Sequence, residues 1–215
     1  NASAETTDES SRTTFTVGFD AEYPPYGYMD DDGEYTGFDL ELAQAVCDKE
    51  GWELVKKPIN WDSKDMELNS GSIDCIWNGF TMNGREDDYT FSEPYVDNSQ
   101  VIVVADDSGI EKLTDLAGKT VGVQAASAAL DLLQSEEEGG QKELADTFGA
   151  LNEFADYNTA FTELQAGALD ALAIDVGVAK YQLNSRGEGF KILDETLNTE
   201  QYAIGFKKGN TELCD

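Results

Sequence analysis

Short apolar runs alternate with segments of helical period along most of the chain. The apolar, β-branched runs predict strands at residues 15–19, 53–57, 73–77, 120–124, 151–154 and 171–174. Apolar positions at helical spacing predict helices at residues 39–50, 62–69, 128–134, 159–166 and 176–184. Strands that alternate with helices are typical of α/β folds with parallel sheets. Two further extended segments, residues 100–105 and 201–206, stand outside this alternation.

Two short patterns occur twice along the chain, in the same order. Residues 16–20 (TVGFD) resemble residues 120–124 (TVGVQ), and L-x-x-G-x-(I/L)-D occurs at residues 68–74 and again at 164–170. Repeats in matching order indicate two similarly built units. We therefore expect an α/β fold of two Rossmann-like lobes, joined by a two-strand hinge and with a ligand-binding cleft between them.

The patterns also predict where the parts of the chain begin and end. Residues 1–14 are small, polar and acidic, which predicts a flexible N-terminal leader. Residues 15–95 together with 203–215 are expected to form lobe 1, and residues 96–202 lobe 2. Residues 210–213 resemble the start of a helix at the point where the sequence stops. The C-terminal helices of lobe 1 are therefore expected to be missing.

The charge of the chain narrows the classes of partner. Lys and Arg number 14 against 44 Asp and Glu, which gives a formal net charge of −30 at pH 7. Such a charge repels phosphate backbones and anionic lipid headgroups, so binding to nucleic acid or to a membrane surface is not expected. No apolar run reaches the ~18–20 residues that a membrane-spanning helix needs.

The chain also lacks several kinds of catalytic and cofactor-binding residue. It contains no histidine, which removes the Ser-His and Cys-His pairs and the commonest zinc ligand, and it has no glycine-rich phosphate loop. We predict no catalytic residue, no cofactor and no metal. The three cysteines, Cys47, Cys75 and Cys214, lack metal-ligand spacing. One disulfide with three open pairings, or three ordinary thiols, both fit the sequence.

Polar residues follow the predicted strands at their carboxyl ends, where open parallel sheets bind ligands. These positions include Asp20, residues 78–81 (NGFT), residues 124–127 (QAAS) and Asp175. Arg85 follows shortly after, and a guanidinium forms paired hydrogen bonds with a planar carboxylate. Asp175 could face an ammonium group. A cation from one lobe and an anion from the other suit a small zwitterion, namely an α-amino acid.

Several motifs also resemble one known family. Residues 37–43 (GFDLELA) are similar to the signature of solute-binding protein family 3, the polar amino-acid-binding proteins that feed ABC importers. Further matches follow in family order at residues 20–26, 79–92, 121–124, 170–175 and 201–204. The resemblance covers roughly residues 15–213. It implies a type II periplasmic-binding-protein-like fold and a binding protein, not an enzyme.

The resemblance also implies a partner and a location. The protein would capture a polar L-amino acid outside the cytoplasm, in the periplasm or as a membrane-tethered lipoprotein at the cell surface. It would deliver the amino acid to the permease of an ABC importer by hinge closure, with hinges near residues 95–98 and 200–202. A monomer is expected, with domain swapping as the alternative if the C-terminal helices are absent.

The resemblance assigns one group of residues to the ligand carboxylate. Arg85 would clamp it, helped by the amide and the hydroxyl of Thr81. Ser127 and the amide of Ala128 would bind the same group at a helix N-terminus. The loop from residue 79 to Arg85 is one residue shorter than in the family, and Ala126 replaces the family's glycine. Ala128 replaces the second hydroxyl residue, so one side-chain donor is lost.

The remaining assignments concern the ammonium and the side chain of the ligand. Asp175 and the Gly79 carbonyl would bind the ammonium, and Tyr23 and Trp61 would sandwich the side chain. Asp20 would accept a hydrogen bond from the side-chain tip. The predicted ligand-binding residues are Asp20, Tyr23, Trp61, Asn78, Gly79, Thr81, Arg85, Ser127, Ala128 and Asp175.

Each assignment has a structural alternative. Arg85 could form a surface ion pair with the acids that follow it, Asp175 and Ser127 could be helix N-caps, and Tyr23 and Trp61 could be core residues. The whole chain has alternatives too: a dehydratase-like enzyme on the same scaffold, or the ligand-sensing domain of a receptor. A neutral polar amino acid is the first choice of ligand and a basic one the second, with glutamine, cystine, histidine, arginine and lysine all open.

Overall fold

The computed structural model describes residues 11–215. Its helices are α1 (Phe38–Glu50), α2 (Lys64–Asn69), α3 (Ala128–Gln134), α4 (Lys142–Ala145), α5 (Tyr157–Gln165), α6 (Val176–Arg186) and α7 (Thr211–Cys214), with short 3-10 turns η2 (Trp61–Ser63) and η3 (Leu113–Leu116). Its strands are β1 (Thr14–Phe19), β2 (Glu22–Tyr23), β3 (Gly27–Met29), β4 (Tyr35–Thr36), β5 (Glu53–Pro58), β6 (Cys75–Ile76), β7 (Tyr89–Phe91), β8 (Val96–Ala105), β9 (Thr120–Gln124), β10 (Ala150–Phe154), β11 (Ala171–Asp175), β12 (Phe190–Ile192), β13 (Asn198–Tyr202) and β14 (Gly205–Lys207).

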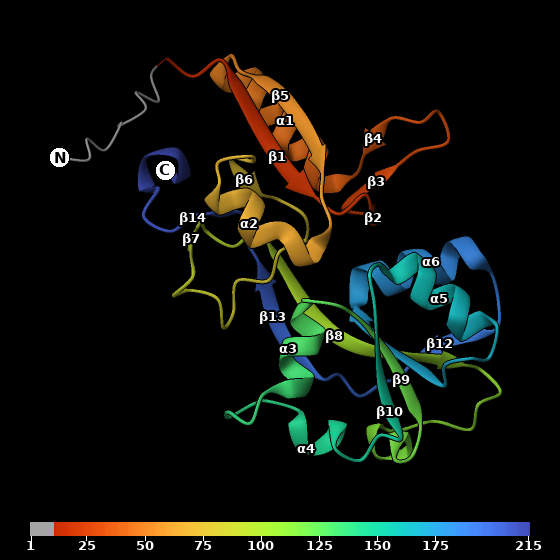
Figure 1. Cartoon of the computed structure of the whole chain (residues 1–215). Coiled ribbons are helices and arrows are strands. Elements are labelled where there is room, and N and C mark those ends of the chain that lie inside the picture. Colours follow the sequence, from red (N-terminus) through yellow and green to blue (C-terminus); the bar gives the residue numbers. More distant parts are fainter. Residues whose placement is uncertain (1–10) are drawn as a thin grey trace.

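The elements gather around two separate sheets (Figure 1). The first sheet has the order β5-β1-β6-β14-β7, with β1 parallel to both β5 and β6. The second has the order β10-β9-β11-β8-β12, and β13 pairs with β8. We call the elements from β1 to β7 together with β14 and α7 the first lobe, and those from β8 to β13 the second lobe.

Both sheets mix parallel strands with antiparallel ones from later in the chain. In the first lobe, β14 returns antiparallel to β6 and β7. In the second lobe, β9 is parallel to β10 and β11, whereas β8 is antiparallel to β11. Helices cover these sheets because their apolar stripes need a partner. In α5, for example, Tyr157, Ala160, Phe161 and Leu164 are buried at helical spacing.

The repeated sequence patterns form the same structure in both lobes. Asp74 accepts a hydrogen bond from the Thr16 amide at 2.7 Å, and Asp170 accepts one from the Thr120 amide at 2.8 Å. In each case the aspartate's own amide donates back to the carbonyl of the same threonine at 2.9 Å. The two L-x-x-G-x-(I/L)-D patterns therefore connect β1 to β6 and β9 to β11 in the same way.

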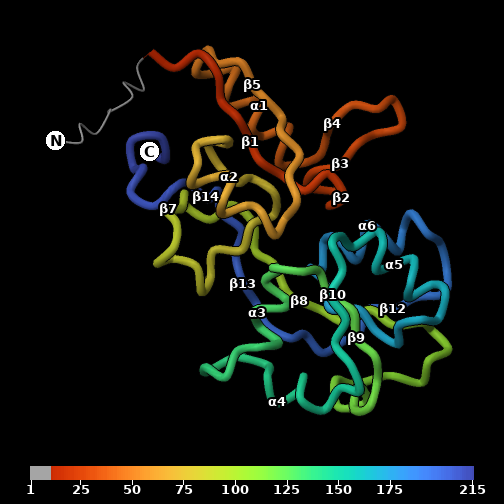
Figure 2. Tube along the Cα trace, viewed as in Figure 1, coloured from red at the N-terminus to blue at the C-terminus, as the bar shows by residue number. Residues whose placement is uncertain are grey.

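The chain crosses between the lobes twice, and the crossings lie side by side (Figures 1 and 2). It leaves β7 through residues 92–95 to enter β8, and returns from β13 through residues 203–204 to β14. β8 and β13 are paired antiparallel from Val96 and Tyr202 onward, and the Tyr95 amide donates to the Tyr202 carbonyl at 3.0 Å. Two adjacent strands can bend together but resist independent rotation of the lobes.

The predicted alternation of strands and helices is confirmed, with a few corrections. β6 is only two residues long, where a strand over residues 73–77 was expected. Residues 100–105 do not cross between the lobes, because they form the inner part of β8. The antiparallel sheet β2-β3-β4 and the short strands β7 and β12 were not predicted. Residues 22–36, which contain β2, β3 and β4, are rich in tyrosine, glycine and proline, and β7 and β12 are only three residues long.

The predicted leader is also shorter than expected. Thr14 already belongs to β1, and the Arg12 guanidinium lies 3.0 Å from the Asp74 carboxylate. The last residues of the 1–14 segment therefore belong to the first lobe, and residues 1–10 lie outside the described part of the chain. At the other end, the helix start expected at residues 210–213 is α7, with the Asn210 side chain accepting from the Leu213 amide.

The three cysteines are free thiols. Cys47 and Cys75 are fully buried in the core of the first lobe, and Cys214 is half-buried beside them. The sequence left one disulfide or three thiols open, and the structure has three thiols. Between residues 11 and 215, no helix combines the length and the apolar character needed to cross a membrane.

Candidate functional site

A small cavity lies between the lobes, where the strands of both sheets end. Its lining residues are Asp20, Tyr23, Trp61, Asn78, Gly79, Thr81, Arg85, Gln124, Ser127, Ala128 and Asp175. The structure thus brings together all ten residues predicted from the sequence and adds Gln124.

Arg85 comes from the loop that follows β6 and lies against the second lobe. Its guanidinium donates to the Thr81 carbonyl at 3.0 Å and approaches the Asp131 carboxylate of α3 at 3.3 Å. It also stacks over the Phe80 ring, 4.8 Å from the centroid. These contacts hold an almost fully buried guanidinium at the cavity wall. The alternative of an ion pair with the neighbouring acids at residues 86–88 is not what the structure has.

Thr81 lines the cavity, but its hydroxyl is already committed. The hydroxyl donates its single hydrogen to the Glu200 carboxylate at 2.7 Å. The expectation that this hydroxyl would donate to a ligand carboxylate is therefore wrong. Only the Thr81 amide is left for that role.

The turn before α3 is held by residues of the first lobe. Ser127 is the N-cap of α3, and its hydroxyl oxygen accepts from the Leu130 amide at 3.1 Å, as the structural alternative proposed. Ala126 has a φ of +55°, a left-handed conformation that non-glycine residues rarely adopt. Its carbonyl lies 3.3 Å from the Lys64 ammonium and 3.5 Å from the Arg85 guanidinium. Two cations of one lobe thus bind one carbonyl of the other.

Asp175 ends β11 and is buried among tyrosines. Its carboxylate accepts from the Tyr202 hydroxyl at 2.5 Å and from the Asn98 side-chain amide at 2.9 Å. Burial raises its pKa to about 6, and the nearby Glu200 carboxylate raises it further in the same direction. Although Asp175 precedes α6, its side chain makes no capping hydrogen bond. Asp175 thus occupies the N-cap position, as the structural alternative had it, but its carboxylate is held beside the cavity and does not cap the helix.

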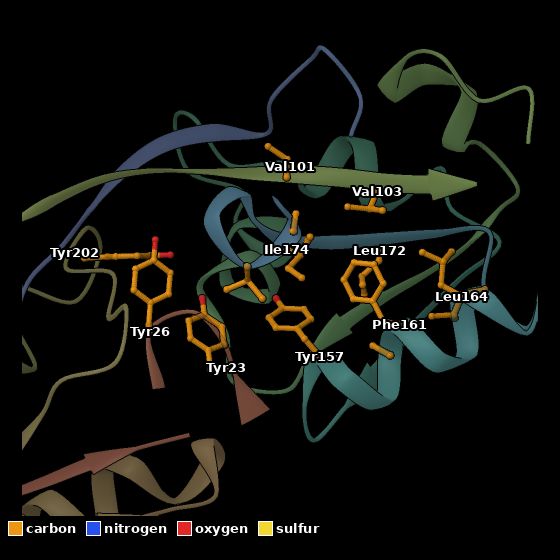
Figure 3. Packing of buried hydrophobic residues seen from close by; sticks show 14 residues of the cluster. Tyr23, Tyr26, Val101, Val103, Tyr157, Phe161, Leu164, Leu172, Ile174 and Tyr202 are labelled. Atoms are coloured by element: carbon orange, nitrogen blue, oxygen red, sulfur yellow. The ribbon is translucent and has the colours of Figure 1, made fainter. Parts of the chain in front are cut away.

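Four buried tyrosines from both lobes belong to one aromatic cluster (Figure 3). Tyr23 and Tyr26 belong to the β2–β3 region, and their ring centroids are 5.9 Å apart. Tyr157 of α5 lies 6.1 Å from Tyr23, and Tyr202 of β13 lies 5.2 Å from Tyr26. Tyr23 therefore lines the cavity and is also a member of a buried aromatic cluster, as the core alternative had it.

Trp61 forms the opposite aromatic wall. It is buried in η2, packs edge-on against Phe80 at 5.5 Å, and has the Lys64 ammonium 5.1 Å from its ring centroid. Burial lowers the pKa of Lys64 to about 8, and the neighbouring Arg85 charge lowers it further in the same direction. No sequence pattern indicated Lys64, because lysine is solvent-exposed in most helices.

Asp20 and Gln124 meet across the cavity. The Gln124 side-chain amide donates to one Asp20 oxygen at 2.7 Å, and the Glu22 amide donates to the other at 2.9 Å. The Asn78 side chain accepts from the Asp20 amide at 3.0 Å. Burial raises the pKa of Asp20 to about 6. Gln124 was named among the strand-end positions but not among the predicted ligand-binding residues, although it occupies the position of the second repeat that Asp20 occupies in the first.

Gly79 shows why one position of the cavity wall must be glycine. Its φ is +54°, and a Cβ there would lie 2.9 Å from Tyr23 and 3.2 Å from Tyr202. Its amide donates at 2.5 Å to Asp39, a fully buried carboxylate of α1 that also accepts from the Tyr95 hydroxyl at 2.8 Å. Burial raises the pKa of Asp39 to about 7. Asp39 belongs to the 37–43 motif, which was a signal for this supporting role.

The arrangement favours recognition of a ligand with both signs of charge. One guanidinium and two carboxylates line the cavity, and no cation lies within salt-bridge distance of Asp20 or Asp175 among residues 11–215. In the same part of the chain, no group of three or more His, Cys, Asp or Glu residues could hold a metal ion.

Comparison with known proteins agrees with this geometry. Residues 15–215 match bacterial extracellular solute-binding proteins, family 3. The arginine-binding extracellular protein ArtP of Bacillus subtilis is 34% identical over 96% of this chain and 79% of its own length. The L-cystine-binding protein TcyJ of Escherichia coli K12 is 30% identical over 94% of this chain and 74% of its own length.

Solved structures show the same fold. A substrate-binding protein of an ABC uptake transporter from Streptococcus pneumoniae, with bound histidine, has a TM-score of 0.87 and 36% identity, over 94% of this chain and 82% of that one. An ancestral arginine-binding protein bound to arginine has a TM-score of 0.82 and 38% identity, over 94% and 88% of the two chains. The expected periplasmic-binding-protein-like fold is confirmed, and this chain belongs to family 3 of the bacterial extracellular solute-binding proteins.

Proposed function

We propose that the protein is the substrate-binding component of an amino-acid ABC importer and that it binds an L-amino acid with a cationic side chain, L-arginine first among them. The observation that carries this proposal is the meeting of Arg85 and Asp175 on one cavity from different lobes. A zwitterion spanning the cavity satisfies both, because its carboxylate pairs with the guanidinium and its ammonium with the carboxylate.

The third charge of the cavity points to the kind of side chain. Once Arg85 and Asp175 are paired with the two ends of an amino acid, Asp20 still carries one negative charge. Its partners, the amides of Glu22 and Gln124, are neutral donors. Because a buried carboxylate is costly without a cation, a ligand that brings a guanidinium or an ammonium to Asp20 is favoured over a neutral one. This reverses the order of choice that the sequence alone gave.

Within this proposal we assign roles to residues that line the cavity. Arg85 and the amides of Thr81 and Ala128 bind the carboxylate, with Ser127 as the cap that orders the turn. Asp175 and the Gly79 carbonyl bind the ammonium. Tyr23, Trp61 and Asn78 enclose the side chain and orient Asp20. Closure of the lobes is stabilised by the ligand because each lobe supplies part of this set.

Isothermal titration calorimetry tests the proposal. The protein is first unfolded, dialysed and refolded, so that any bound ligand is removed. L-arginine is expected to bind most tightly, followed by L-lysine, and both more tightly than L-glutamine, L-histidine or L-cystine. Agmatine, which lacks the carboxylate, and 5-guanidinopentanoate, which lacks the ammonium, are matched controls that should bind far more weakly. Absence of heat with every amino acid would refute the amino-acid proposal. Tighter binding of glutamine than of arginine would refute only the cationic side chain.

The partner and the location extend the same proposal. Family membership places the protein outside the cytoplasm. We infer that it acts there as a monomer that docks on a membrane permease, and that a lipoprotein anchor tethers it through the polar residues at its N-terminus. Light scattering with and without L-arginine tests the monomer, since a mass of twice 23.5 kDa would indicate the domain-swapped alternative.

Binding without chemical change is part of the proposal. Asp20 and Asp175, the carboxylates of the cavity, already accept hydrogen bonds and would be paired with the ligand's positive groups, so neither is free to act as a general base. L-arginine incubated with the protein should be recovered unchanged by NMR. Any product that forms in proportion to protein concentration would favour the dehydratase-like alternative.

A further inference from the structure

Glu200 is a buried carboxylate that does not line the cavity. It lies in β13, next to the crossing between the lobes and in register with Asn98 of β8. Its side chain is 5% exposed, and no cation lies within salt-bridge distance among the described residues. A buried carboxylate without a cation is costly, so its contacts need an explanation.

Three donors meet on one oxygen of this carboxylate. The Thr81 hydroxyl donates to Glu200 Oε1 at 2.7 Å, the Asn98 side-chain amide at 2.7 Å and the Gln100 side-chain amide at 2.6 Å. Thr81 belongs to the first lobe, whereas Asn98 and Gln100 belong to the second. Glu200 therefore links a cavity residue of one lobe to a crossing strand of the other.

The same contacts lead directly to Asp175. The Asn98 side-chain nitrogen that donates to Glu200 also donates to Asp175 Oδ2, at 2.9 Å. One amide thus bridges two carboxylates, and the Glu200 charge is felt at Asp175, where it raises the pKa. Two negative charges held close together, one in the cavity wall and one behind it, attract a positive group in the cavity more strongly than either alone.

We propose that Glu200 is a positioning residue for the ammonium group of the ligand: through Asn98 it fixes the Asp175 carboxylate, through Thr81 it fixes the opposite wall, and its charge strengthens the attraction for the ammonium. This inference rests on the proposed amino-acid ligand. It concerns a residue that touches no ligand and acts entirely through its neighbours.

The variant Glu200→Gln keeps the shape of the side chain and removes its charge. L-arginine affinity at pH 8 is expected to fall about tenfold. The affinity for 5-guanidinopentanoate, which has no ammonium, should stay within about twofold of the wild-type value. Glu188→Gln removes the same charge at an exposed turn of the second lobe and is the matched control, with no change expected for either ligand. Equal losses for both ligands would overturn the proposal.

A second measurement needs no ligand. Carbon-13 NMR of the Asp175 side chain follows its titration in wild-type and Glu200→Gln protein. The groups that face Asp175 are Tyr23, Tyr26, Tyr157, Tyr202 and Glu200, and Asp20 lies across the cavity. Glu200 alone among them is an acid held to Asp175 by a shared donor, so its removal should shift the Asp175 midpoint to lower pH. An unchanged midpoint would contradict the proposal, even if no amino acid bound.

A third variant covers the case in which Glu200→Gln does not fold. Asn98→Ala removes the bridging amide and leaves both carboxylates in place. The Asp175 midpoint should then move to higher pH, the opposite direction, because one donor to the ionised form is lost and the repulsion remains. A shift to lower pH, or none, would show that the two carboxylates are not coupled. Failure of L-arginine to bind wild-type protein would instead count against the proposed function.

Discussion

The two lobes are built on one plan but present different chemistry to the cavity. In both, the aspartate that ends the L-x-x-G-x-(I/L)-D pattern accepts a hydrogen bond from a backbone amide of an earlier strand. The donor is Thr16 of β1 in one lobe and Thr120 of β9 in the other. In both, a glycine of the repeated strand lies under an aliphatic side chain: Gly18 under Ile73, and Gly122 under Leu169. In the interior of each lobe, a glycine of the strand therefore lets an aliphatic side chain pack closely against the backbone.

The strand ends, by contrast, have diverged. Asp20 and Gln124 are equivalent positions of the repeat, and they meet across the cavity in a hydrogen bond of 2.7 Å. Farther along, the first lobe adds the guanidinium of Arg85 and the second the carboxylate of Asp175. Packing constrains the strands and helices inside each lobe, whereas the residues beyond the strand ends can differ. A zwitterion needs them to differ, because its two ends carry opposite charges.

The largest expected effect comes from removing the charge that one lobe supplies. Asp175→Asn is expected to weaken L-arginine binding about 100-fold or more, because the ligand ammonium loses its buried partner and Glu200 alone remains behind it. Calorimetry measures the loss. Arg85→Met should cost a similar factor from the other lobe, and Asp194→Asn, at an exposed position, should cost nothing. A variant of either lobe that binds normally would show that this lobe is not needed.

The second prediction concerns how the buried carboxylates Asp20 and Asp175, one from each lobe, make the free energy of unfolding depend on pH. The pKa values of Asp20 and Asp175 are raised to about 6 in the folded protein, mainly by burial. A raised carboxyl pKa contributes stability below the unfolded value near 4, and that contribution is lost as the pH rises through about 6. Relative to wild type, Asp20→Asn and Asp175→Asn should each gain up to about 3 kcal/mol of unfolding free energy between pH 4 and pH 7.

Urea unfolding at pH 4, 5, 6 and 7 measures this difference. The change with pH is the quantity of interest, since each variant also has an effect that does not depend on pH. Ligand affinity should show the opposite trend in the wild type, because protonated Asp175 no longer attracts an ammonium. Parallel stability curves for variant and wild type would contradict the prediction.

The third prediction tests whether the repeated strands pack in the same way inside the two lobes. Gly18→Ala and Gly122→Ala should each lower the free energy of unfolding by about 1–2 kcal/mol, because the new Cβ overlaps the end of Ile73 or Leu169. Thermal or urea unfolding gives the values. Shortening the overlapped side chain to valine in the same protein should restore part of the loss. A loss in one lobe only would mean that the repeat is similar in sequence but not in packing.

The smallest expected effect concerns the one place where the second lobe has a strained backbone. Ala126 is the sole non-glycine residue with positive φ between residues 11 and 215. Ala126→Gly should raise the free energy of unfolding by up to about 1 kcal/mol, since glycine adopts this conformation without a steric cost. Differential scanning calorimetry checks it. Ala125→Gly, next to it, should lower the stability instead.

Much of this molecule could be predicted because its signals are local. Residues 128–134 were expected to be a helix and form α3, and the strand-end residues from Asp20 to Asp175 gather at one cavity as open α/β sheets require. The repeat alone indicates two lobes. Patterns within ten or twenty residues were enough for each of these inferences.

What could not be predicted depends on residues far apart in the chain. Thr81 and Glu200 are 119 positions apart, and no pattern around either one indicates that a hydroxyl is taken by a carboxylate. The Lys64 ammonium binds the Ala126 carbonyl across the cleft, which requires the two lobes to be in place. The β2-β3-β4 sheet was missed because its short strands obtain their stability from packing and not from alternation.

The three free thiols have a consequence for the conditions under which the protein can fold. Since Cys47 and Cys75 are enclosed by the first lobe and no covalent link joins any of the three, the native fold needs no oxidant to form. Dithiothreitol should leave its melting temperature unchanged. The chain can therefore acquire this structure in reducing surroundings, without any disulfide-forming catalyst.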